Sequence, residues 1–116
     1  MRMLTITVAA IAVATSAWAI ELATSAQIQS AISDKTVQGS MEASGAYTEY
    51  YAADGTIRGE GYTGSWYVEA DTMCFKYGED PADCWGVSID GESVAWVKEG
   101  KAEGTGTIVS GNPNNF

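Results

Sequence analysis

Histidine is absent from the 116 residues of this chain. Its absence excludes Ser-His and Cys-His nucleophile pairs and the imidazole proton shuttle on which many hydrolases depend. It also removes the commonest ligand of zinc and copper sites. The sequence therefore predicts a non-enzymatic protein with no catalytic residues, no metal site and no cofactor. An enzyme that uses only carboxylates and tyrosines stays as a more distant alternative.

Basic residues are scarce, with six Lys and Arg against fifteen Asp and Glu. Arg2 falls in the leader described below, so residues 20–116 keep five basic residues against fifteen acidic ones, a formal net charge of −10. A surface without a basic stripe repels nucleic-acid phosphates and anionic lipid headgroups, so neither nucleic acid nor an anionic membrane is expected as a partner. The acids are spread along the chain, which is typical of a solubilising surface.

A long apolar segment is also missing. The apolar run at 4–13 is shorter than the ~20 residues that a membrane helix needs. It follows Arg2 and precedes Ala17-Trp18-Ala19, a small-residue pattern that signal peptidase cleaves. The sequence thus predicts a signal peptide over 1–19, no membrane span, and a single β-barrel-like domain over 20–116 that works in the periplasm or as a secreted protein.

Only two cysteines are present, Cys74 and Cys84. An exported chain meets an oxidising compartment, so an even cysteine count favours a disulfide between them. A redox pair more typically has the C-x-x-C spacing. Glu79, Asp80 and Asp83 crowd the segment between the cysteines and offer oxygen ligands for calcium, but the order of residues in an EF-hand loop is missing. A solvated loop is the simpler interpretation.

The order of residue types predicts one short helix followed by β structure. The helical candidate lies within 21–37, where Thr24 and Gln27 have the spacing of a capping box. Beyond it, runs of Tyr, Trp, Val, Thr and Ile alternate with Gly and Asp. Asp54-Gly55 and Asp90-Gly91 indicate tight turns, whereas 78–83 and 98–101 suggest looser reversals. The expected strands are 36–41, 45–52, 55–60, 63–70, 72–77, 84–89, 93–98 and 103–109.

Connections this short force sequential antiparallel pairing, an up-and-down meander. A meander of this length curls to hide its edges, which predicts a mainly β protein with a small closed or half-open barrel and the helix covering an opening or edge. If the cysteines face each other, Met73 lies opposite Trp85 and Phe75 opposite Asp83. Period-two alternation then places Met73, Phe75, Tyr77, Trp85, Val87 and Ile89 on one face.

Aromatic residues are the candidate binding surface. Tyrosine joins a broad apolar face to a polar tip, which suits contact with a ligand or a protein, although cross-strand packing is the simpler interpretation of such residues. Alternation sends Tyr47 and Tyr51 to one face of their strand and Tyr50 to the other, while three tryptophans are expected inside. The possible ligand or partner surface comprises Tyr47, Tyr50, Tyr51, Tyr62, Tyr67, Trp66, Trp85 and Trp96.

Three segments carry a family resemblance. Segment 25–39 contains S-A-Q-I and K-T-V-Q-G, and segment 47–59 has Tyr47 and Tyr51 before D-G-T and R-G. Segment 64–85 has G-S-W before both cysteines. Together they resemble a group of small exported bacterial proteins of unknown function with a lipocalin-like meander. The chain is more distantly similar to periplasmic inhibitor barrels that block proteases or lysozymes. The resemblance implies a barrel and a periplasmic location, but no activity.

Two functions of different class follow from these features. The first is a periplasmic binding or inhibitory module that acts on another protein through its loops and exposed tyrosines. The second is a lipocalin-like carrier of a small apolar ligand, because closed barrels of about eight strands can hold one small molecule. The contents of the barrel interior distinguish the two, since a carrier needs a cavity.

Overall fold

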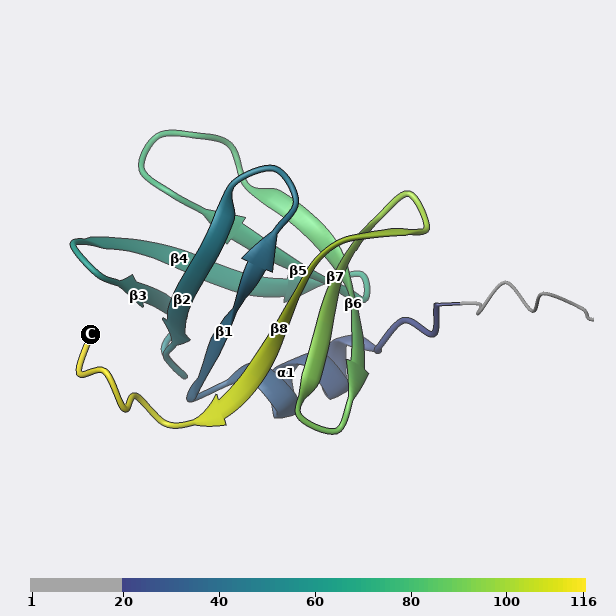
Figure 1. The fold of residues 1–116 in the computed structure, drawn as a ribbon. Coiled ribbons are helices and arrows are strands. Elements are labelled where there is room, and N and C mark those ends of the chain that lie inside the picture. The colour runs from purple at the N-terminus through teal and green to yellow at the C-terminus, as the bar shows by residue number, and fades with distance from the viewer. Residues whose placement is uncertain (1–19) are drawn as a thin grey trace, which may run out of the picture.

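Residues 20–116 are described by the computed structural model, and they form one helix and a closed antiparallel barrel (Figure 1). Each strand pairs with the next along the chain, and the last pairs with the first. The fold is therefore the predicted mainly β meander, and its barrel is closed. The elements are α1 (Ser25–Ile32), β1 (Lys35–Met41), β2 (Gly45–Tyr51), β3 (Thr56–Gly59), β4 (Tyr62–Glu69), β5 (Thr72–Lys76), β6 (Asp83–Asp90), β7 (Ser93–Lys98) and β8 (Lys101–Ser110).

Short turns explain the meander, and every predicted strand end falls within two residues of the observed one. The prediction of a looser reversal at 98–101 was wrong. Glu99 and Gly100 both have positive φ (50° and 76°), as a two-residue type I′ turn requires. Ala70 and Asp71 make the same kind of turn, with φ of 49° and 58°. Neither Ala70 nor Asp71 is a glycine, so the residue types at these positions do not by themselves predict a turn with positive φ.

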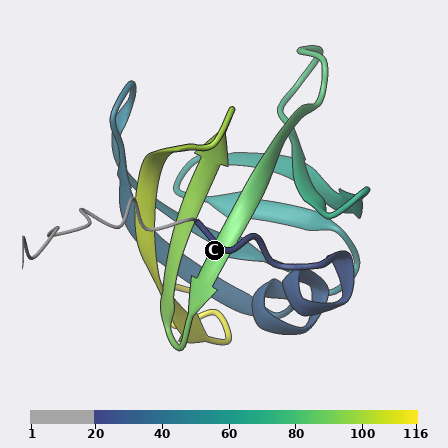
Figure 2. The same ribbon diagram turned by 90° about the vertical axis from the view of Figure 1, so that its right-hand side faces the viewer.

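Helix α1 closes one end of the barrel. Thr24 begins it with the predicted capping box, in which its hydroxyl accepts from the Gln27 amide and the Gln27 side chain accepts from the Thr24 amide. Ile28 and Ile32 are fully buried and join the core of the barrel. The helix is shorter than the 21–37 segment because Asp34 has a φ of 60°, which ends the helical path before β1. Figures 1 and 2 show α1 beneath the strand ends.

The predicted register between β5 and β6 is confirmed. Cys74 lies opposite Cys84, Met73 opposite Trp85 and Phe75 opposite Asp83. The two cysteines are joined as a disulfide, with their sulfur atoms 2.04 Å apart. The link connects adjacent strands on either side of the loop at 77–82. It is compatible with a protein that works in an oxidising compartment.

Two predictions concern the leader and the membrane. The proposed signal peptide, 1–19, lies outside the residues that the structure describes. Within 20–116, no helix has the length and apolar character needed to cross a membrane.

We expect the disulfide to contribute strongly to the stability of so small a domain. Replacing both cysteines (Cys74→Ala with Cys84→Ala) should lower the free energy of unfolding by about 2–3 kcal/mol, since the crosslink closes a short loop in the unfolded chain. Urea unfolding of oxidised protein and of the double variant measures the change. Reductant should lower the stability of the original protein and leave the variant unaffected. Equal stability of the two proteins would contradict this role.

Candidate ligand-binding cavity

A cavity of about 700 Å³ occupies the end of the barrel opposite α1. It is lined by the β1–β2 turn, by the β5–β6 loop and by inward side chains of β1, β2, β4, β5, β6 and β7. Its mouth lies among exposed loop residues, so the cavity opens to solvent. In Figure 1 this end carries the hairpin tips, away from the helix. The lining residues are Met41, Ser44, Tyr47, Glu49, Tyr51, Tyr62, Phe75, Tyr77, Asp80, Pro81, Ala82, Asp83, Trp85 and Trp96.

Glu49 is the most unusual of these lining residues, because a carboxylate is rarely buried without a partner. It lies on β2 with only 7% of its surface exposed. Its oxygens accept hydrogen bonds from the hydroxyls of Tyr51 (Oε1, 2.9 Å), Tyr62 (Oε2, 2.9 Å) and Tyr77 (2.9 and 2.8 Å to the two oxygens). We call Glu49 and these three tyrosines the Glu49 cluster. It joins β2 to β4 and to the end of β5 across the barrel interior.

Glycines make room for the rings of this cluster. A Cβ atom at Gly59 would lie 2.2 Å from the Tyr62 ring, and one at Gly64 would lie 2.8 Å from the Tyr77 ring. Real Cβ atoms essentially never come within 3.0 Å of another heavy atom. The two tyrosines therefore reach Glu49 only because their neighbours on the inner wall have no side chain.

A second polar contact fixes the wall beside the cluster. The Trp96 indole Nε1 donates to the Tyr47 hydroxyl at 2.7 Å, and that hydroxyl donates to the Thr105 carbonyl oxygen at 3.0 Å. A Cβ at Gly106 would lie 2.6 Å from the Tyr47 hydroxyl, so this glycine is also needed. Both polar tips are satisfied within the protein, which leaves the ring faces as the surface offered to the cavity.

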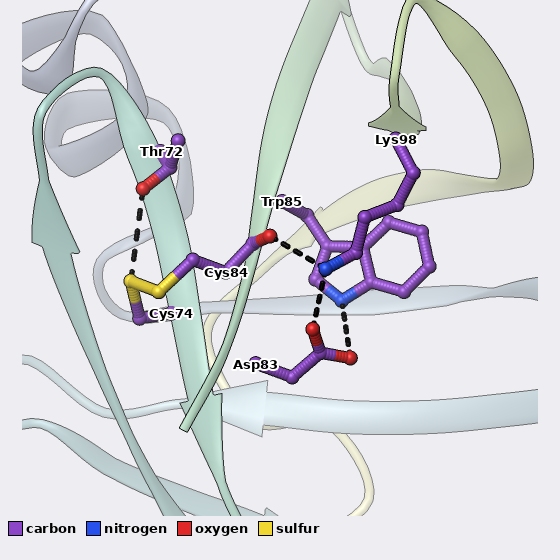
Figure 3. A network of polar contacts seen from close by, with 6 residues as sticks. All are labelled: Thr72, Cys74, Asp83, Cys84, Trp85 and Lys98. Atoms are coloured by element: carbon purple, nitrogen blue, oxygen red, sulfur yellow. Dashed lines mark hydrogen bonds and ion pairs between the residues drawn. A yellow bond between two sulfur atoms is a disulfide. The ribbon is translucent and has the colours of Figure 1, made fainter. Parts of the chain in front are cut away.

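The rim carries a different polar group (Figure 3). The Lys98 ammonium donates to Asp83 Oδ1 and, at 2.8 Å, to the Cys84 carbonyl oxygen. It lies 4.4 Å from the centre of the Trp85 ring, and Trp85 Nε1 donates to Asp83 Oδ2 at 3.2 Å. The charge of Asp83 is thus neutralised by Lys98. This contact fixes the Trp85 ring at the mouth of the cavity.

The Glu49 cluster changes the acidity of its tyrosines. Burial raises the pKa of the Tyr51, Tyr62 and Tyr77 hydroxyls above the ordinary tyrosine value, and the nearby Glu49 charge raises it further. Burial also raises the pKa of Tyr47, an effect that the hydrogen bond from Trp96 partly offsets. All four tyrosines therefore stay neutral hydroxyl donors at physiological pH.

Five of the predicted aromatic residues line the cavity, and three do not. Tyr50 and Tyr67 lie on the outer face, where Tyr50 donates to Asp34. Trp66 is buried deeper in the barrel, and its Nε1 donates to the Ala52 carbonyl oxygen at 2.9 Å. The residues that line the cavity are Tyr47, Tyr51, Tyr62, Trp85 and Trp96.

Sequence reasoning missed Glu49. Glu49 lies between Tyr47 and Tyr51 in a strand with period-two alternation, so the sequence could have predicted that it shares their inward face. Two of its three partners could not be predicted, because Tyr62 on β4 and Tyr77, directly after β5, come from parts of the chain that do not pair with β2. Glu79 and Asp80 lie in the loop between β5 and β6, and Asp83 is the first residue of β6. No group of three metal-ligating side chains occurs among the described residues.

Comparison with known proteins gives no match to a family model, to a curated protein or to a solved structure. The resemblance to small exported bacterial proteins stays a prediction. The geometry of the cavity is therefore the main guide to function.

The raised tyrosine pKa values predict a loss of stability in alkali. Tyrosines of the unfolded chain release protons near pH 10, whereas the Glu49 cluster keeps its protons in the folded state. The unfolded state then binds fewer protons, so stability is intact below about pH 10 and falls as pH rises further. Urea unfolding across this range measures the slope. Tyr77→Phe should make the slope shallower, and parallel curves for the two proteins would contradict the prediction.

Proposed function

We propose that this protein is an exported, lipocalin-like carrier or binder of one small molecule, which it holds in the open end of its barrel. The observation that carries the proposal is the cavity of about 700 Å³. Its size lies within the ~300–1,000 Å³ usual for small-molecule sites. Its lining combines aromatic rings with a few fixed polar groups, the pattern that holds and orients a small ligand.

The two ends of the barrel differ in a way that supports this function. Ile28 and Ile32 of α1 fill the lower end, together with Val37, Met73 and Val87, all of which are fully buried. The upper end keeps an open space although large aromatic side chains surround it. A purely structural barrel of this size can be filled by side chains throughout. The retained space is best explained by an occupant.

The alternative, an inhibitory module that contacts another protein, has less support from the positions of its residues. It depended on exposed aromatic side chains, but Tyr51, Trp66 and Trp96 are 1%, 4% and 3% exposed. Among residues 20–116, Tyr62 and Tyr67 are the large aromatic side chains that remain well exposed, at 44% each, and Tyr62 belongs to the cavity. The ligand-binding function uses more of the observed aromatic cluster.

Binding of a neutral fluorescent probe tests the proposed function. N-phenyl-1-naphthylamine, which is uncharged at neutral pH, should increase its emission on binding to residues 20–116, with one probe per chain by native mass spectrometry. Ala82→Trp places a large ring at the mouth and should weaken binding. Ala95→Trp is the matched control, since alternation places Ala95 on the outer face of β7.

The control variant should bind the probe like the original protein. No probe binding to the original protein, or equal binding to both variants, would overturn the assignment of the cavity as the ligand site.

A further inference from the structure

We propose that the cavity selects organic cations, in which a protonated amine lies at the Glu49 cluster and an aromatic or apolar body lies against the surrounding rings. This inference rests on the proposed function and names the chemical class of its ligand. It is argued from the charge of the cavity, from the hydrogen bonding of Glu49 and from the aromatic lining.

The charge of the cavity is negative. Its lining contains the carboxyl groups of Glu49, Asp80 and Asp83 and no Lys or Arg. Lys98 at the rim pairs with Asp83, and the only other ion pair among residues 20–116 joins Lys101 to Glu42. Glu49 therefore carries its charge without a cation from the described part of the chain.

Three neutral hydroxyls compensate only part of the cost of burying this charge. They satisfy the hydrogen-bonding capacity of the carboxylate, but they supply no opposite charge. A buried ionic group can often be replaced by apolar residues at little cost in stability. An apolar ligand alone would thus give no reason for an acid at this position, whereas a cationic ligand would complete the ion pair.

The hydrogen bonds leave a ligand room to approach Glu49. Tyr77 makes contacts of 2.9 and 2.8 Å to the two carboxylate oxygens but has a single proton to donate. Tyr62, at 44% exposure, is the most accessible member of the cluster and can return its hydroxyl to solvent when a ligand ammonium replaces it.

The aromatic lining suits the remainder of such a ligand. Tyr47, Phe75 and Trp96 present rings around the same space, and their polar tips, where present, are already bonded within the protein. Aromatic faces attract cations and pack against flat apolar groups. The cavity therefore places one carboxylate beside several aromatic rings. This combination suits a ligand that carries an amine and an aromatic group, an arylalkylamine, better than it suits a fatty acid or a sugar.

Three probes with one apolar body and different charge test the inference. They are 2-(1-naphthyl)ethylamine, 2-(1-naphthyl)ethanol and 3-(1-naphthyl)propanoate, measured by displacement of N-phenyl-1-naphthylamine from residues 20–116. The amine should bind at least about tenfold more tightly than the alcohol, the difference expected of a charge-assisted hydrogen bond. The carboxylate should bind most weakly.

Two variants assign this preference to Glu49. In Glu49→Gln the amine and the alcohol should bind within about twofold of each other, while the alcohol keeps its affinity. Glu69→Gln, which removes an exposed carboxylate at the far end of β4, is the matched control and should keep the full preference. Tyr62→Phe removes a competing hydroxyl and should keep or increase it, which gives a second test if Glu49→Gln does not fold.

The outcomes separate the two proposals. Binding of N-phenyl-1-naphthylamine without a preference for the amine would overturn the cationic ligand class and leave the ligand-binding function standing. A preference that persists in Glu49→Gln, or one that Tyr62→Phe abolishes, would also overturn it. Failure of every probe to bind would overturn both.

Discussion

A negative charge held inside the barrel is the constraint on which the upper half of this molecule depends. Burying the Glu49 carboxylate is costly unless donors surround it, and the protein supplies three tyrosine hydroxyls from β2, β4 and the end of β5. Two of those rings fit only because Gly59 and Gly64 leave the inner wall bare. The glycines, the tyrosines and the acid are thus parts of one arrangement.

The lower half of the barrel, near α1, is stabilised by the burial of apolar side chains. Helix α1 inserts Ile28 and Ile32 beneath the strands, and the surrounding inner wall is apolar and fully buried. Stability is therefore concentrated at the end near the helix and at the crosslinked β5–β6 pair. The open end can therefore contain a cavity and a buried charge without an ion-pair partner. Both features lower stability, and a domain of this size could not contain them along the whole barrel.

Much of the fold was predictable because its signals are local. Alternation gave the inward faces, short Gly- and Asp-containing connections gave the meander, and facing cysteines gave the β5–β6 register. The turn at Ala70-Asp71 carried no glycine, and the tight turn at Glu99-Gly100 was taken for a looser one. Glu49 was missed because two of its partners, Tyr62 and Tyr77, come from parts of the chain that do not pair with β2. They approach Glu49 only when the sheet closes into a barrel, and no single segment of the sequence indicates that contact.

The charge state of Glu49 inside the folded barrel is the quantity on which the account turns. It can be measured by infrared spectroscopy of protein with isotope-labelled glutamate carboxyl groups. The spectrum of Glu49→Gln is subtracted from that of the original protein at neutral pH. The account predicts that the band lost from the variant is the stretch of an ionised carboxylate. A carbonyl stretch of a protonated carboxylic acid in its place would contradict the account, because a neutral Glu49 offers no charge for a cationic ligand.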